Sequence, residues 1–358
     1  MAMFRPHFDN VRGQGDRISS AANASALDVA ESDDPYVDAR YGHTWSFTPK
    51  RGAALYGRTE DFPASPIDHL ANGRFLRVPF RRVPVIDVGS ADELAAFAGR
   101  ITSADKTIQL MWRGQVKEYY LARTNDELER LFGSTSALEP SLVPSASRAN
   151  VEFADVLPAW SAILDLYISE CREILRTAHG SIADEIAQFH ASYNYRLWAF
   201  ATAQHYGLPS VGLDITTDLW TAVLFALHEF RYDATSARTI ASRAPAGAQP
   251  VVYAMGGFQN DLFEDAALAP SYLQCQRPKA QTAHFFGTGW GAASNKAAER
   301  IFIAFRLLNH HGWTLRKRIE DLFPPTSADP FVAFLLRVRE RHPDIARHAR
   351  LDRVYYLS

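Results

Sequence analysis

An arginine that ends an apolar stretch is the first residue of this sequence with evident chemical potential. It stands in the string Trp112-Arg113-Gly114-Gln115. A guanidinium offers five N–H donors in a planar fork, which suits the oxygens of a phosphate or a carboxylate. Gly114 has no side chain, so a ligand or another backbone can approach the strand closely there. Two interpretations stay open: Arg113 binds an anion in a cleft, or it pairs with an acidic residue of the core.

A second polar group lies at a predicted helix end, in the string Ala203-Gln-His-Tyr-Gly-Leu-Pro209. Gly207 suits the left-handed position that follows a helix, and Pro209 cannot continue one. His205 and Tyr206 therefore fall in the last helical turn, where a protonated histidine complements the helix dipole. His205 is either a residue that faces a ligand or a side chain satisfied by the helix end.

Three further polar residues lie near predicted element boundaries. Asp214 and Thr216 precede the next predicted helix, where side-chain oxygens cap free backbone N–H groups. A capping role explains at least one of them. Gln281 stands at the entry to a predicted strand, where its amide can satisfy backbone groups or contact a hydroxyl, but it cannot act as a base near neutral pH.

Common catalytic and metal-binding signatures are absent from the sequence. It contains no Gly-x-Ser-x-Gly, no Gly-x-x-x-x-Gly-Lys-Ser/Thr and no His-Glu-x-x-His. The adjacent His310 and His311 would diverge on a helix or a strand, and the two cysteines, Cys171 and Cys275, cannot build a metal site by themselves. No metal site is predicted.

Taken together, these segments resemble the FRG domain, a prokaryotic family named for a Phe-Arg-Gly motif. The segments run in the family's order, and the string Gln204-His-Tyr-Gly-Leu-Pro209 is the specific one. The other matching segments are residues 90–94, 111–115, 142–145 with Arg148, 213–216, 222–226, Arg277 with Gln281 and Phe285, and 315–324. Trp112 replaces the family's usual Phe or Tyr, Val211 its usual Arg, and Ile215 its usual Trp. An anion held by that arginine in the family would be held differently here.

The order of the motifs also resembles, more distantly, that of ADP-ribosyltransferases. This resemblance implies that Arg113 holds the pyrophosphate of NAD and that Thr216 or Asp214 contacts a ribose. The residues implied to bind NAD are Arg113, Gly114, Gln115, His205, Tyr206 and Thr216. The residues implied to be catalytic are Arg113, Asp214 and Gln281. Those enzymes usually carry a Glu on a late strand, whereas the one Glu-x-Glu here, Glu127-Leu-Glu129, lies in an early predicted helix.

The resemblances imply an NAD-binding, ADP-ribosyltransferase-like effector that uses NAD as a substrate, in transfer or in hydrolysis. The settings in which the family recurs are toxin systems and anti-phage defence, with a macromolecular target that the sequence does not identify. The alternative is a non-catalytic module that senses a nucleotide, a nucleic acid or a protein. A purely structural partner protein is a third possibility. Loss of the family's Arg and Trp favours these two alternatives, whereas retention of Arg113, His205, Asp214 and Gln281 favours a working site.

The elements that must position these residues follow from apolar periodicity. Period-two runs predict strands at 106–112, 251–255, 282–286 and 300–307. Period-3.6 runs predict helices at 153–177, 182–190, 196–206, 218–230, 316–322 and 331–341. The expected class is α/β of the α+β type, with a mixed or antiparallel sheet flanked by several helices. An ADP-ribosyltransferase-like core is what the resemblance adds to this class.

Four segments are expected along the chain. Residues 1–40 are polar and read as flexible, and residues 41–85 read as an extended arm that packs on the core. The FRG-like domain is assigned to residues 86–325. Residues 326–358 are assigned to a helical extension at the C-terminus.

Composition limits the class of protein. The chain has 358 residues, of which 47% are hydrophobic, so it can bury a large core. Its net charge of −2 gives no support to nucleic-acid binding. Few cysteines fit a reducing compartment, and no signal peptide or membrane-spanning run is recognised. A cytoplasmic protein without a membrane partner is expected.

Overall fold

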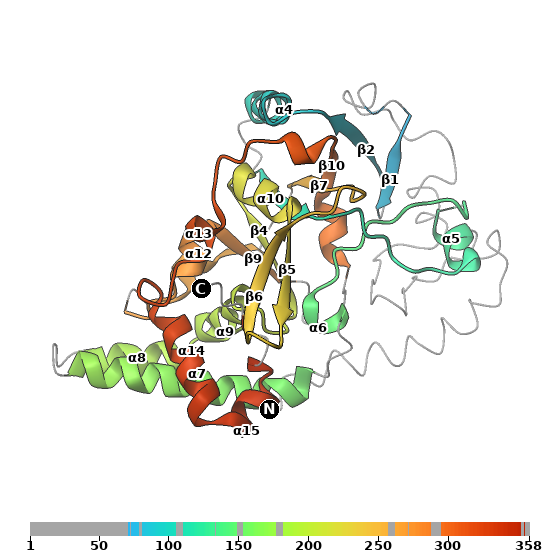
Figure 1. Cartoon of the computed structure of the whole chain (residues 1–358). Helices are drawn as coiled ribbons and strands as arrows, with labels where there is room; N and C mark the ends of the chain where they lie inside the picture. The colour runs from blue at the N-terminus through green and yellow to red at the C-terminus, as the bar shows by residue number, and fades with distance from the viewer. Residues whose placement is uncertain are drawn as a thin grey trace.

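One mixed sheet of eight strands forms the centre of the computed structural model (Figure 1). The structure describes residues 71, 73–78, 81–104, 110–132, 134–148, 153–176, 182–256, 262–270, 272–287, 295–351 and 354. Across the sheet the strands are β1 (Phe75–Val78), β2 (Arg81–Val88), β10 (Ile301–Leu307), β7 (Val251–Met255), β3 (Met111–Gln115), β4 (Gly212–Thr216), β9 (Ala283–Gly287) and β8 (Leu262–Glu264).

Both strand directions occur in this sheet. β2 and β10 run parallel, with Val85 opposite Ala304, and the other neighbouring pairs are antiparallel. The parallel pair requires a long crossover, which the intervening chain provides. The predicted α+β class with a mixed sheet is confirmed.

Helices cover the sheet and extend beyond it. Their bounds are α4 (Ala91–Ala104), α5 (Asn125–Phe132), α6 (Ser145–Arg148), α7 (Phe153–Arg176), α8 (Ile182–Ala191), α9 (Tyr193–His205), α10 (Leu219–Ala226), α11 (Asp265–Leu268), α12 (Gln276–Ala280), α13 (Ile319–Leu322), α14 (Pro330–Arg341) and α15 (Pro343–His348), with short 3-10 turns at Lys296–Arg300 and His310–Gly312. Among these described helices, none has the length and apolar character that crossing a bilayer requires.

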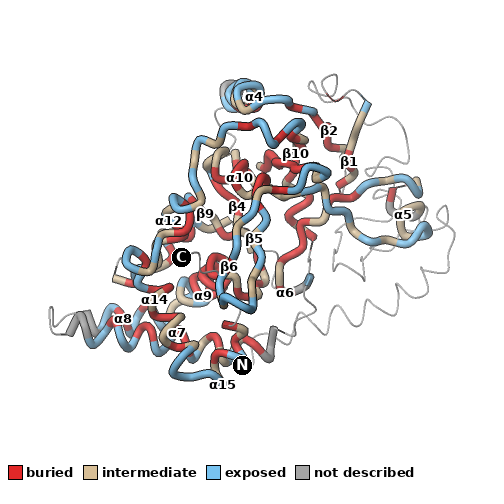
Figure 2. Tube along the Cα trace, viewed as in Figure 1, coloured by how far each residue is buried: buried red, intermediate tan, exposed pale blue. Residues whose placement is uncertain are grey.

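The apolar core has a sheet part and a helical part. On one sheet face, α4 and α10 bury Leu94 and Val223 against Phe305. Below the sheet, α7, α9 and α14 pack on one another around Phe331, which is fully buried. Figure 2 shows buried residues along the strands and on the inner sides of these helices. Helix α9 spans both parts, so its C-terminal end reaches the sheet.

The observed core is wider than the predicted domain. The boundary expected at residue 86 falls inside β2, and β1 continues the same sheet, so residues 75–78 and 81–85 belong to the core. At the other end, Phe331 and Leu335 of α14 are fully buried, so the helix belongs to the core. Residues 1–70, with the predicted flexible segment and most of the predicted arm, lie outside the described residues.

A two-stranded hairpin stands apart from the main sheet, where a helix was predicted to continue to residue 230. The helix α10 ends at Ala226, and β5 (His228–Asp233) pairs with β6 (Arg238–Arg243) (Figure 1). Arg243 donates from Nη2 to the carbonyl oxygens of His310 and Trp313, both at 3.0 Å. The hairpin is therefore tied to the segment that follows β10.

Helix α9 stops as the sequence predicts. Gly207 has φ +85°, and the N–H of Leu208 donates to the carbonyl of Ala203 at 3.0 Å. This pattern places Gly207 at the left-handed position after the helix, where a Cβ is unfavourable.

The Gly207→Ala variant is expected to lose about 1 kcal/mol of unfolding free energy, the usual penalty of a side chain in this conformation. Chemical denaturation of the wild type and the variant measures the difference. Unchanged curves would contradict the assignment of this helix end.

Candidate functional site

A cavity opens where β3 and β4 separate. Among the described residues these strands share a single register pair, Trp112 opposite Thr216. Beyond that pair the carbonyl of Asp214 accepts from the Arg113 side chain, at Nη1. The cavity encloses about 240 Å³. Of the residues singled out in the sequence, those that line it are Arg113, Gly114, Gln115, His205, Asp214, Thr216 and Gln281.

Arg113 combines burial with an unused donor. Its guanidinium bonds to the carbonyl of Asp214, and its Nε has no hydrogen-bond partner among the described residues. The pKa of Arg113 is lowered to about 10, first by burial and then by the like charge of Arg148, while the Asp214 carboxylate acts against both. A cation desolvated in this way favours an incoming anion.

Arg148 supplies a second guanidinium at the same cavity. It ends the short helix α6 and is exposed. The helix is held in place through Ser145, whose Oγ accepts from the backbone N–H of Ser210 at 2.9 Å and lies 3.3 Å from Oε1 of Gln204. Sequence reasoning cited Arg148 within a matched segment and did not assign it a ligand. Two like charges that line one cavity are unfavourable without an anion between them.

Asp214 is the carboxylate that lines this cavity close to Arg113. Its Oδ1 is buried and has no hydrogen-bond partner among the described residues. Burial raises the pKa of Asp214 to about 7, and the nearby Asp265 raises it as well, whereas His205 and Arg113 lower it. A carboxylate with this pKa can accept a proton near neutral pH.

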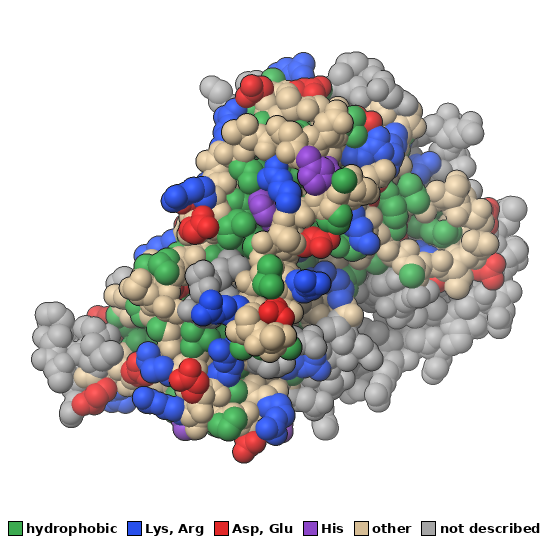
Figure 3. Space-filling view, viewed as in Figure 1, with side chains coloured by type: hydrophobic (Ala, Val, Ile, Leu, Met, Phe, Trp, Pro, Cys, Tyr) green, Lys and Arg blue, Asp and Glu red, His purple; other side chains and the backbone are tan. Residues whose placement is uncertain are grey.

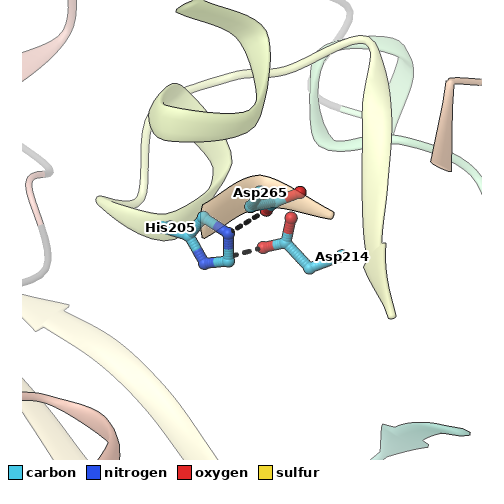
Figure 4. A group of neighbouring side chains, drawn as sticks. All are labelled: His205, Asp214 and Asp265. Carbon is cyan, nitrogen blue, oxygen red and sulfur yellow. Dashed lines mark hydrogen bonds and ion pairs between the residues drawn. The ribbon is translucent and has the colours of Figure 1, made fainter. Parts of the chain in front are cut away.

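His205 lies behind Asp214 and contacts three polar side chains. Its Nε2 bonds to Oδ2 of Asp265, and its Nδ1 lies 2.9 Å from Oε1 of Gln281 and 3.5 Å from Oδ2 of Asp214. Figure 4 shows the two aspartates converging on the imidazole. Burial alone would lower the pKa of His205, but Asp214, Asp265 and Gln281 together raise it to about 9.

Sequence reasoning missed Asp265. It is the first residue of α11, directly after β8, and is 3% exposed. No motif surrounds it, and β8 is a three-residue edge strand that has no clear apolar period. The register of β8 on β9 brings it to His205, and only the assembled sheet shows this.

Gln281 and Thr216 reach the cavity with their polar atoms already engaged. The Nε2 of Gln281 donates to the carbonyl of Leu322 at 3.1 Å, while its Oε1 faces His205. The hydroxyl of Thr216 donates to the carbonyl of Gln281 at 2.8 Å and accepts from the N–H of Asp218 at 3.0 Å. Both residues hold the site together, and neither has a polar atom left over for a catalytic step.

Gly114 and Gln115 differ in what they offer. A Cβ at Gly114 would lie 1.9 Å from the carbonyl oxygen of Ala222, so the close approach predicted there is made by the backbone of α10. Gln115 donates from Nε2 to the carbonyl of Ser141 at 3.2 Å, and its buried Oε1 has no partner among the described residues. Gln115 therefore lines the cavity with a buried, unpartnered acceptor, and Gly114 serves packing.

Tyr206 is turned away from the cavity, so the predicted contact with a cofactor is not supported. Its hydroxyl donates to Oδ2 of Asp329 at 2.8 Å, and its ring packs edge-on against Phe331. The guanidinium of Arg277 lies 4.5 Å above the ring. The residue faces the helical part of the core because successive residues at a helix end point in different directions.

Aromatic side chains form the apolar wall of the cavity. Phe225, Phe230 and Phe323 all line it, with ring centroids 5.1 to 6.0 Å apart. They come from α10, the hairpin and the segment after α13. Tyr119 stands at the same cavity and is 38% exposed. The cavity therefore offers a flat heterocycle both an apolar wall and cationic groups within one site.

Ligand atoms of His205, Asp214 and Asp265 lie within 4.8 Å of one another, a spacing that some metal sites share. In this arrangement both ring nitrogens of His205 already face oxygen acceptors, so neither has a lone pair for a cation. The charges of His205 and Arg113 also balance those of the two aspartates. The cluster fits an ion-pair network better than a cation site.

Comparisons with known proteins found no family model that matches this chain, and no significant match among curated proteins or solved structures. The site is therefore interpreted from the chain's own residues.

Proposed function

We propose that the cavity binds NAD and that the protein is an ADP-ribosyltransferase-like effector. One observation carries this proposal: Arg113, whose buried Nε has no hydrogen-bond partner among the described residues, and Arg148 line the same cavity. A planar fork beside a second cation is the arrangement that a diphosphate requires.

The size and polarity of the cavity support a nucleotide. A volume of about 240 Å³ is slightly below the range of about 300–1,000 Å³ that is usual for small-molecule sites. It suits one half of a dinucleotide, with the diphosphate at the arginines and a ring on the aromatic wall. The other half would extend past Tyr119.

The positive character of the site is local. On the face that Figure 3 shows, basic and acidic side chains are interspersed, and the whole chain carries a net charge of −2. An extended polyanion needs a broad basic surface to bind well. A small anionic ligand fits this charge distribution better than a nucleic acid.

Asp214 is the residue we assign to the chemistry. When the bond between nicotinamide nitrogen and ribose C1′ breaks, its electron pair leaves with nicotinamide and positive charge develops at C1′. A carboxylate close to C1′ stabilises that charge. Water or an acceptor group then adds to C1′ and gives its proton to Asp214, whose pKa of about 7 suits the transfer. Asp214 would thus take the place of the late-strand Glu.

Replacing Asp214 is expected to separate chemistry from binding. Asp214→Asn should lower the release of nicotinamide from NAD by about 100-fold or more, the usual range for a general base. Affinity for NAD should change only a few-fold, because the arginines remain. Chromatography measures the release and calorimetry the affinity, with Asp126→Asn, at an exposed residue of α5, as the control. Equal release by wild type and Asp214→Asn would refute this role.

A non-catalytic nucleotide sensor is the second candidate function. The engaged polar atoms of Gln281 and Thr216 favour it, since two of the residues expected to act on the ribose are held by the fold instead. Wild-type protein that binds NAD but releases no nicotinamide would support this candidate over the enzyme. A role in toxicity or anti-phage defence is proposed for either one.

A further inference from the structure

The hydrogen bonds around His205 determine its protonation state. Nε2 of Gln281 donates to the carbonyl of Leu322, an acceptor only, so the amide must place its Oε1 toward His205. The opposite amide orientation would set two oxygens against each other. Oε1 cannot donate, so the Nδ1 of His205 must carry a proton.

The second ring nitrogen is constrained in the same way. Nε2 of His205 contacts Oδ2 of Asp265, which is 3% exposed and whose other oxygen has no hydrogen-bond partner among the described residues. A buried carboxylate is stable as an anion only beside a donor or a cation. With Asp265 as the anion, Nε2 must donate to it, so both ring nitrogens carry protons and the ring is an imidazolium.

We infer that Asp265 is a positioning residue that holds His205 as a buried imidazolium, and that this cation keeps the Asp214 carboxylate ionised where it faces the cavity. The inference about His205 stands on geometry alone, whereas its consequence for catalysis rests on the proposed function. Asp265 does not line the cavity, and the hydrogen bond of its side chain goes to the imidazole.

The charged groups around His205 come from four elements. Asp214 on β4 lies 3.5 Å from Nδ1, and Asp265 on α11 bonds to Nε2. Arg277 on α12 donates from Nη1 to the backbone carbonyl of His205 at 3.2 Å. Arg113 on β3 faces the far side of Asp214 and lowers its pKa, as His205 does. Of the two cations that act on Asp214, His205 is the one that can lose its charge.

Removal of the Asp265 charge should therefore change the pKa of Asp214 through the charge of the imidazole. In Asp265→Asn, His205 loses the nearer of its two anionic partners while it stays buried, so its pKa falls and the ring becomes neutral near pH 7. Asp214 then loses one of its two cations, and its pKa rises, because His205 acts on it more strongly than the Asp265 anion, whose removal alone would lower the pKa. An opposite charge at this distance shifts a pKa by about 1–3 units. The acid limb of the pH profile of nicotinamide release should therefore move to higher pH by about one unit or more.

The pH profile distinguishes positioning from simple damage. Release by Asp265→Asn should fall by about tenfold or more at pH 7 and recover toward the wild-type rate at higher pH, because Asp214 then ionises again. Asp265→Glu, which keeps the carboxylate, should retain the wild-type limb. A uniform loss at every pH in Asp265→Asn would overturn the inference, as would an unmoved limb.

A direct measurement of the ring does not depend on turnover. In ¹⁵N-labelled wild-type protein without NAD, the His205 resonances, assigned by their loss in His205→Gln, should show two protonated ring nitrogens at pH 8. A single protonated nitrogen would overturn the inference even if NAD is cleaved. Two protonated nitrogens without NAD cleavage would uphold the imidazolium and reject the proposed function instead. Stabilisation by Zn²⁺ or Mn²⁺ that Asp265→Asn abolishes would also overturn it, since a metal ligand cannot carry the second proton.

Discussion

Arg113→Lys is expected to remove the effect of NAD on thermal stability while the protein stays folded. A ligand at 100 times its Kd stabilises a protein by about 2.7 kcal/mol, so saturating NAD should raise the wild-type midpoint measurably. Lysine keeps the positive charge that Asp214 faces, but it presents a single donor group in place of a planar fork. The variant should therefore fold and fail to respond to NAD.

The Arg113→Ala variant tests how much Arg113 contributes to the stability of the fold. Alanine removes a cation from a site that also holds Asp214 and Asp265, and an uncompensated buried charge costs about 3 kcal/mol or more. The alanine variant should thus be clearly less stable than the lysine variant. Arg231→Lys, in the exposed hairpin, is the matched control and should respond to NAD as the wild type does. Equal NAD responses in Arg113→Lys and wild type would show that Arg113 only supports the fold.

Gly114→Ala is expected to destabilise the protein by about 3 kcal/mol or more, at the upper end of the cost of overpacking a core. The new Cβ would meet the carbonyl oxygen of Ala222 at 1.9 Å and the backbone nitrogen of Ala226 at 2.7 Å. Both atoms belong to the backbone, so no side-chain rotation relieves the contact. Either β3 or α10 must shift, and both line the cavity.

The control for this variant is Gly99→Ala. Gly99 lies inside α4 and is exposed, and a Cβ there would have no atom within 4 Å. Alanine in a helix is more favourable than glycine by about 0.5–1 kcal/mol, so this variant should be slightly more stable than wild type. Urea denaturation compares the three proteins. A Gly114→Ala protein as stable as Gly99→Ala would contradict the packing of β3 on α10.

Local pattern was sufficient to predict much of the architecture. The strand at Val251–Met255 has the predicted bounds, and α7 and α14 differ by a single residue at one end. These segments combine a strong period with clear end signals. Gly207 was predictable because the left-handed position after a helix favours glycine whatever the tertiary context.

Elements that depend on distant partners were not predictable. Residues 212–216 carry an aspartate and a threonine that read as a helix cap, yet they form β4 because β9 pairs with them along their whole length. The hairpin β5–β6 continues an apolar run that looked helical past Ala226. Tertiary pairing decides such segments against their local propensity.

The candidate site shows the same division. The convergence of Arg113, Asp214 and Gln281 on one cavity agrees with the order of the motifs. The roles of individual atoms did not follow from that order. The side chain of Gln281 is hydrogen-bonded to Leu322 and His205, and Asp265 comes from a segment without a motif. A hydrogen-bond partner far along the chain leaves no signal in the local sequence.

The most direct test of the central claim, that the Arg113 fork binds the diphosphate of NAD, compares two ligands by calorimetry. ADP-ribose carries the diphosphate and adenosine does not, and neither has a nicotinamide bond to cleave. We predict that wild-type protein binds ADP-ribose, that Arg113→Lys binds it at least about tenfold more weakly, a loss of about 1.4 kcal/mol, and that adenosine binding is the same in both proteins. Absence of ADP-ribose binding by the wild type, or equal affinities in the two proteins, would contradict the claim.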